Sequence, residues 1–178
     1  MSNSFRLRHR RNKGNAIAEM PGAIWLFLVG MLFPLIALIT LSYRVVLLYN
    51  GIRDCTYQAA LQQSFTEAQT KAKDVLTKDV GAFTGITVNL GTEPRVQIVT
   101  KNLASGVEST SSAKLAPGSV NATANNYFIR VFVTAQVEPL INMGTTGFWT
   151  GIPGLTGPIQ LKDMVYQQFA ENPNGLES

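Results

Sequence analysis

Two residues near the start of the chain stand out by their type and position, a glycine directly after a basic run and a lone carboxylate directly before an apolar one. Gly14 follows a run of cations without an acid, and the lone carboxylate of Glu19 lies five residues later, at the edge of a long apolar segment. Cleavage after Gly14 would create an N-terminal ammonium at Asn15 and make Glu19 the fifth residue of the shortened chain. A carboxylate at a bilayer edge is disfavoured without a cation, and an ammonium group is a strong partner where the dielectric constant is low.

No group of residues in the sequence suggests catalysis by this chain. The only histidine, His9, precedes Gly14, and the only cysteine, Cys55, has no evident base, so they supply neither a nucleophile–base pair nor a metal-ligand set. The other carboxylates are scattered among polar positions: Asp54, Glu67, Asp74, Asp79, Glu93, Glu108, Glu138 and Asp163. We expect no enzyme activity, no metal and no cofactor. Cys55 is interpreted as a packed structural thiol, with an intermolecular disulfide or a reactive thiol as the alternatives.

The distribution of charge argues against a nucleic-acid partner. The formal net charge of +4 combines +5 before Gly14 with −1 after it. The five cations before Gly14 are Arg6, Arg8, Arg10, Arg11 and Lys13. A basic tail on a nearly neutral body is not a basic domain. The 178 residues leave room for one ordinary domain and an anchor, and we expect no binding of nucleic acid.

A segment without charged residues runs from Met20 to Tyr43 and contains AIWLFLVGMLFPLIALITL. As a helix it would rise ~36 Å, enough to cross the ~30 Å hydrocarbon layer of a bilayer. Trp25 near one end, and Tyr43 with Arg44 at the other, suit the two membrane interfaces. The preceding cations favour a cytoplasmic N-terminus and an extracytoplasmic remainder. A secretory signal peptide is the competing interpretation, but no small-residue cleavage site follows the apolar run.

The order of basic leader, Gly14, four residues, Glu19 and apolar helix resembles the processing site of type IV prepilins. The resemblance implies that a prepilin peptidase cuts between Gly14 and Asn15, and that Glu19 pairs with the N-terminal ammonium of a neighbouring subunit. The stretch GNAIAEMPGAIWLFLVGMLFPLIALI looks like the TadE-like minor pilins of tight-adherence systems. An ordinary signal anchor with an incidental Glu19 is the alternative interpretation.

Three residues in the apolar segment disfavour a regular helix. Pro21 and Gly22 depart from a typical pilin, and residues 15–20 are therefore expected to be less helical. Pro34 is expected to kink the helix in the middle of the span.

Beyond the membrane, the residue pattern predicts an α+β domain. Apolar residues at three- and four-residue spacing predict an amphipathic helix from near Arg53 to about Lys78. Its apolar stripe contains Tyr57, Leu61, Phe65, Ala68, Ala72 and Val75. Alternation predicts strands at 86–90, 96–98 and 127–137, and a last strand through Ile159, Leu161 and Val165. A small antiparallel sheet packed on the C-terminal half of a long helix should result, an architecture that the resemblance to pilins also implies.

Two connections between the strands differ in character. Residues 102–126 are rich in Ser, Ala, Asn and Gly and predict an exposed loop. The segment from Pro139 to Pro158 mixes Gly and Pro with large apolar side chains, and we interpret it as a lid over an open edge of the core. The alternative is a contact surface for another subunit or a target, anchored by Phe148 and Trp149.

The sequence thus predicts three parts: a basic leader at 1–14, a transmembrane helix at 15–50 and an extracytoplasmic pilin-like domain at 51–178. We expect a pilin-like subunit, a minor pilin or pseudopilin, for adhesion or secretion. It would lie in the inner or cytoplasmic membrane and be built into or beneath an extracellular filament. The resemblance implies as partners the prepilin peptidase, other pilin subunits, a membrane platform protein, an assembly ATPase and the lipid bilayer. The alternatives are a type II secretion pseudopilin and an unprocessed single-pass protein whose outer domain binds or senses a ligand.

Overall fold

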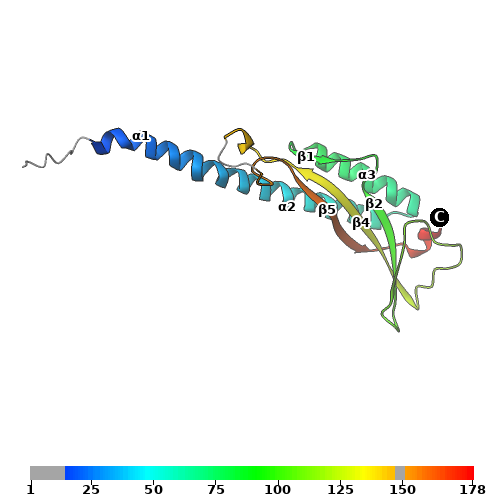
Figure 1. The fold of residues 1–178 in the computed structure, drawn as a ribbon. Helices are drawn as coiled ribbons and strands as arrows, with labels where there is room; N and C mark the ends of the chain where they lie inside the picture. The colour runs from blue at the N-terminus through cyan, green and yellow to red at the C-terminus, as the bar shows by residue number, and fades with distance from the viewer. Residues whose placement is uncertain (1–14, 147–150) are drawn as a thin grey trace, which may run out of the picture.

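The computed structural model describes residues 15–146 and 151–178, and these residues form an α+β fold with a long N-terminal apolar helix. The helical elements are α1 (Asn15–Phe27), a π-helical segment η1 (Leu28–Leu32), α2 (Phe33–Ala60), α3 (Phe65–Gly81) and two 3-10 segments, η2 (Met143–Thr146) and η3 (Pro173–Glu177). The strands are β1 (Ile86–Val88), β2 (Arg95–Asn102), β3 (Glu108–Ser111), β4 (Asn125–Val137) and β5 (Ile159–Phe169). Figure 1 shows α1 and α2 as one long rod, blue to cyan, whose first half projects from the domain.

The rod continues through both prolines that were expected to disturb it. Pro21 lies inside α1, so the expected loss of helix at residues 15–20 is wrong. The proline ring clashes with the carbonyl four residues earlier, which is in the first turn of α1, where the backbone can adjust at low cost. At Pro34 the helix widens instead of breaking: the N–H of Phe33 donates to the carbonyl of Leu28, five residues back. Pro34 itself has no N–H to donate. The kink expected at Pro34 stays a prediction.

The predicted single helix from Arg53 to Lys78 is interrupted, which corrects the sequence prediction. α2 ends at Ala60 and α3 begins at Phe65. The hydroxyl of Ser64 accepts a hydrogen bond from the N–H of Glu67 (3.2 Å) and so caps α3. A side-chain acceptor at this position satisfies a donor that a helix start leaves free, which favours a new helix over continuation. Figure 1 shows α3 running back beside α2.

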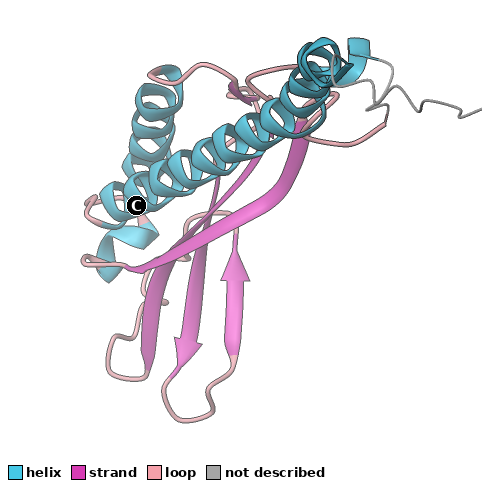
Figure 2. Ribbon diagram, turned by 90° about the vertical axis from the view of Figure 1, so that its left-hand side faces the viewer, coloured by secondary structure: helices cyan, strands magenta, loops and turns pink. Residues whose placement is uncertain are grey.

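The sheet is antiparallel and centred on β4. β2 and β1 pair with successive parts of β4 along one edge, and β5 pairs along the other. Figure 2 shows the strands curling beneath α2 and α3, which lie on the same side of the sheet. The core between the two layers contains side chains from α2, α3, β2 and β4: Leu48, Ile52, Cys55, Phe65, Ala72, Leu76, Ile98, Tyr127, Ile129, Val131 and Val133. The prediction of an antiparallel sheet packed on the helix is confirmed.

β3 lies within the segment predicted to be a loop, so that prediction is partly wrong. Residues Glu108–Ser111 pair with residues 98–101 of β2. The four residues are polar on both faces, and their strand conformation comes from pairing with β2 rather than from any burial of their side chains.

A bulge divides β5 and reverses which side chains face the core. Val133 of β4 pairs with Met164 and Ala135 pairs with Leu161, so two residues of β5 lie opposite Thr134. Asp163, one of the two, has a φ of 52°, a conformation that aspartate tolerates better than most residues. Because the extra residue shifts the alternation, Val165 of the predicted last strand is 46% exposed.

The packing prediction for Cys55 agrees with the structure. Its side chain is fully buried among the core residues of α2 and α3, and its Sγ donates to the carbonyl of Ile52 (3.1 Å). Tyr57, by contrast, is 45% exposed although it was assigned to the apolar stripe. The stripe shifts because α2 packs on β4 and β5 as well as on α3.

Candidate functional site

The proposed processing site lies at the start of the described chain. α1 begins at Asn15, the residue that cleavage would make the new N-terminus, and Glu19 lies in this helix two residues before Pro21. Gly14 lies outside the described residues. Figure 1 shows α1 extending away from the sheet, and no described strand or other α-helix of this chain packs against it.

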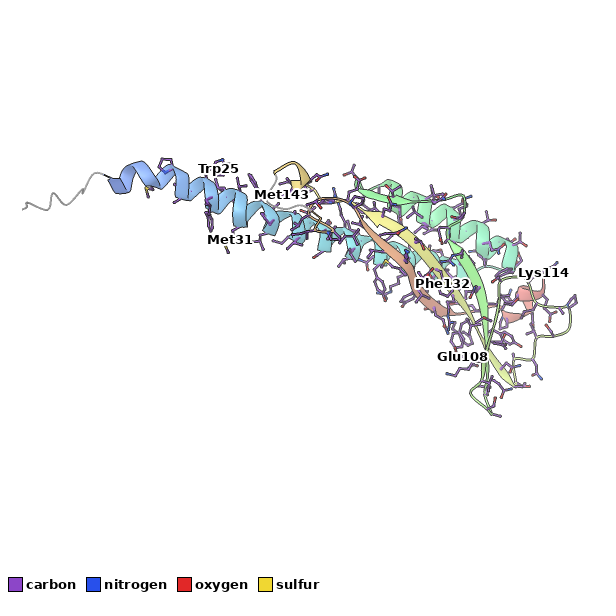
Figure 3. All side chains as sticks on the ribbon, viewed as in Figure 1. Trp25, Met31, Glu108, Lys114, Phe132 and Met143 are labelled. Carbon is purple, nitrogen blue, oxygen red and sulfur yellow. The ribbon has the colours of Figure 1, made fainter. Side chains whose placement is uncertain are left out.

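The first half of the rod presents a continuous apolar surface. The helical run Met20–Ala60 is long and apolar enough to cross a membrane, and most of its most apolar window is not covered by the rest of the protein. Figure 3 shows the labelled side chains of Trp25 and Met31 clear of the domain. The other exposed apolar side chains up to Ile39 are Met20, Ile24, Leu26, Phe27, Phe33, Leu35, Leu38 and Ile39. A helix that is apolar all round requires lipid or other helices around it.

Arg44 joins the rod to the sheet. Its Nη1 donates to the carbonyl of Glu138, the residue after β4, and the N–H of Glu138 donates to the carbonyl of Gly85 (2.8 Å). Gly85 has a φ of 81°, and a Cβ at this position would lie 2.4 Å from the guanidinium carbon of Arg44. The close approach requires glycine and fixes the sheet against the helix. The expected place of Arg44 at a membrane interface stays a prediction.

The connection between β4 and β5, called here the 139–158 loop, covers the rod just before Arg44. Met143 and Leu155 are buried, and the N–H of Met143 donates to the carbonyl of Leu155 (2.7 Å). A Cβ at Gly154 would lie 2.9 Å from Cδ2 of Leu41, so the loop backbone touches α2 directly. Figure 3 shows Met143 beside the rod. The same Cβ would lie 2.7 Å from Cδ1 of Ile159, so the described part of the loop packs on β5 as well as on α2. Its role as a lid over an open edge of the core stays a prediction.

The two residues expected to anchor a contact in this loop, Phe148 and Trp149, lie outside the described residues. The expectation that they contact another subunit or a target surface stays a prediction.

A polar cleft lies on the face of the sheet opposite to α2 and α3. The sequence had predicted no site there. Arg95 of β2 donates from Nη2 to Asp163, lies 3.3 Å from Glu93, and stacks over the ring of Phe132 at 5.7 Å. The hydrogen bond to Asp163 raises the pKa of the Arg95 guanidinium, which stays charged. The cleft has a volume of about 820 Å³ and includes Thr134. Its cation and its two carboxylates are paired with one another, so it offers no free charge to an ionic ligand.

This polar cluster could not be predicted from the sequence, because Arg95 and Asp163 are separated by 68 positions. Only the pairing of β2 and β5 with β4 brings them together.

No metal-binding cluster occurs in residues 15–146 and 151–178: nowhere do three or more His, Cys, Asp or Glu side chains come close enough to hold an ion. Comparisons of the chain with protein-family models, with curated proteins and with solved structures give no match.

Proposed function

We propose that the chain is a pilin-like structural subunit, a TadE-like minor pilin or pseudopilin that is processed by a prepilin peptidase and assembled through its N-terminal helix. One observation carries the proposal: a basic leader, Gly14 and Glu19 directly precede an apolar helix, and that helix continues without a linker into the core of an α+β domain. A flexible linker would let the domain move relative to the apolar helix. A helix shared by both parts instead fixes the orientation of the domain relative to the apolar segment.

Glu19 has the central role in this proposal. Cleavage after Gly14 supplies one ammonium group per subunit, and the Glu19 carboxylate of a neighbouring subunit is its complement. A charge pair in low dielectric is favoured over two isolated charges, so pairing sets the axial register while exposed apolar side chains of α1 pack laterally. The platform protein and the assembly ATPase of such a machine are proposed partners on the same basis.

The N-terminal sequence of the mature protein, isolated from its native membrane, tests the processing step. We expect the unaltered chain to begin at Asn15 and a Gly14→Leu variant to keep its leader. Gly22→Ala is the control, because a Cβ at Gly22 meets no atom within 4 Å, and this variant should also begin at Asn15. An unaltered chain that begins at Met1 or Ser2 would contradict the proposal and leave a membrane-anchored ligand-binding or sensing protein as the working hypothesis.

A second variant tests the assembly step separately. The Glu19→Gln variant is expected to be cleaved normally but not to assemble, because an amide cannot compensate the ammonium charge. Chemical cross-linking of neighbouring subunits in the membrane measures assembly, and the variant should give fewer cross-linked subunits. The matched control is Asp74→Asn, which makes the same chemical change on the exposed face of α3. Equal cross-linking in both variants would show that Glu19 has no part in assembly.

A further inference from the structure

The 139–158 loop is unusual for a surface connection because it carries no charge. No Asp, Glu, Lys, Arg or His occurs between Glu138 and Lys162. On the described part of this loop, Leu140 is 56% exposed and Ile152 is 40% exposed. Exposed aliphatic side chains in a stretch without charge are typical of a surface that meets an apolar partner.

The loop lies at the level where the apolar rod would leave a bilayer. Pro34, Ala37 and Leu41 belong to the charge-free segment of the rod, and all three are buried. Gly154 of the loop contacts Leu41, and Figure 1 shows the loop beside the beginning of α2. The rise from Met20 to Leu41 is ~32 Å, close to the ~30 Å thickness of the hydrocarbon layer. A rod that enters lipid near Met20 therefore leaves it near Leu41, beneath the loop.

Several backbone N–H groups of the loop donate hydrogen bonds within the loop itself, which suits an environment with little water. The N–H groups of Leu155 and Thr156 donate to the carbonyl of Ile152 (3.1 and 3.0 Å), and the N–H of Gly154 donates to the carbonyl of Gly157 (3.0 Å). The N–H of Gly144 donates to the side chain of Asn142 (2.9 Å). Polar groups bonded within the loop cost less to bring next to acyl chains than groups that depend on water.

We propose that the described parts of this loop, residues 139–146 and 151–158, are seated in the outer surface of the lipid bilayer, with Leu140 and Ile152 inserted at the boundary between headgroups and acyl chains. The partner is the lipid itself. Because the loop has no cation, the contact depends on apolar burial, and a zwitterionic phosphatidylcholine bilayer is sufficient. The inference rests on the membrane placement in the proposed function, and it adds a second membrane contact that fixes the domain against the lipid surface.

The test uses the full chain in phosphatidylcholine nanodiscs that hold one copy each. An environment-sensitive fluorophore is attached at Ile152→Cys or at Leu140→Cys, and its quenching by nitroxide-labelled lipids is measured. Val107→Cys, an exposed aliphatic position beside β3, is the matched control, and Leu26→Cys on α1 reports insertion of the rod. The unaltered chain is the labelling blank, because its only cysteine, Cys55, is buried.

We expect lipid nitroxides near the headgroup to quench the labels at 140 and 152 at least about two-fold more than the label at 107. Quenching at 26 together with no excess at 140 and 152 would overturn the loop contact and leave the membrane placement intact. Absence of quenching at 26 would overturn the placement itself, and the loop contact with it.

Discussion

Gly175, near the C-terminus, is a position where only hydrogen fits as a side chain. A Cβ there would lie 1.7 Å from the carbonyl oxygen of Gln63, in the turn between α2 and α3. We expect Gly175→Ala to lower the free energy of unfolding by about 1–3 kcal/mol, because η3 must move away from the turn. Thermal denaturation of the full chain in detergent, followed by circular dichroism, measures the change.

Gly81→Ala is the control for this prediction, because a Cβ at Gly81 meets no atom within 4 Å. Its effect should stay within about 0.5 kcal/mol, as for most surface substitutions. Equal melting temperatures for the two variants would mean that η3 is not held against the turn in solution.

Glu177 provides a pH-dependent contact in the same C-terminal segment. Its carboxylate accepts hydrogen bonds from the N–H groups of Gly118 (2.8 Å) and Val120 (2.7 Å), and these bonds lower its pKa below the ordinary 4.5. A group whose pKa is lower in the folded state adds stability above its unfolded pKa and loses it as the pH falls through the folded value. The contribution should therefore be complete at neutral pH and decline below about pH 4.5.

Urea unfolding of the full chain and of Glu177→Gln at a series of pH values tests this prediction. The unaltered protein should have the higher midpoint at pH 7, and the difference should shrink as the carboxylate is protonated. A difference that is the same at pH 3 and pH 7 would show that the charge of Glu177 does not contribute.

At the level of elements, the turn between the two helices depends on Ser64. Its hydroxyl accepts the N–H of Glu67 at the start of α3. Ser64→Ala is expected to cost about 1 kcal/mol, the usual loss for an N-cap. Thr70→Ala, on the exposed side of α3, is the control and should be neutral, since alanine favours the helix interior. Denaturant unfolding distinguishes the two variants; if Thr70→Ala were as costly, the loss at Ser64 could not be assigned to capping.

The turn between α2 and α3 is a feature that the apolar periodicity of the sequence did not predict. Apolar spacing continues through Leu61 and Phe65, so periodicity alone predicts one helix, although Ser64 followed three residues later by Glu67 is a helix-start signal. The apolar rod was predictable from its long run without charged residues, and the strand β4 from its strict alternation over many residues. β3 was not predictable, since its four polar residues become a strand only by pairing with β2.

The candidate sites also differ in whether the sequence alone could predict them. The spacing of Gly14 and Glu19 is local and can be read from the sequence, and their roles stay predictions. The contact of Arg44 with Glu138, and the cover that the 139–158 loop gives to Leu41, join segments far apart in the chain, so only the fold reveals them.

For the whole molecule, the long helix combines an apolar segment long enough to cross a membrane with a segment that belongs to the core. Its first half is exposed and apolar, while Leu48 and Ile52 of its second half are buried between α3 and the sheet. Arg44 and the 139–158 loop lie where the two halves meet. The apolar end is therefore joined to the sheet through consecutive helical segments without a linker.

Two truncations test this division of the helix. A chain that lacks residues 1–43 keeps Leu48 and Ile52 and should be soluble, with cooperative unfolding in urea. A chain that lacks residues 1–53 loses both side chains, each of which is at most 1% exposed. Loss of a large buried aliphatic side chain costs about 2–5 kcal/mol, and two such losses approach the 5–15 kcal/mol stability of an ordinary domain. We therefore expect the shorter chain not to unfold cooperatively. If both chains unfolded at the same urea concentration, the second half of α2 would be an attachment to the domain and not part of its core.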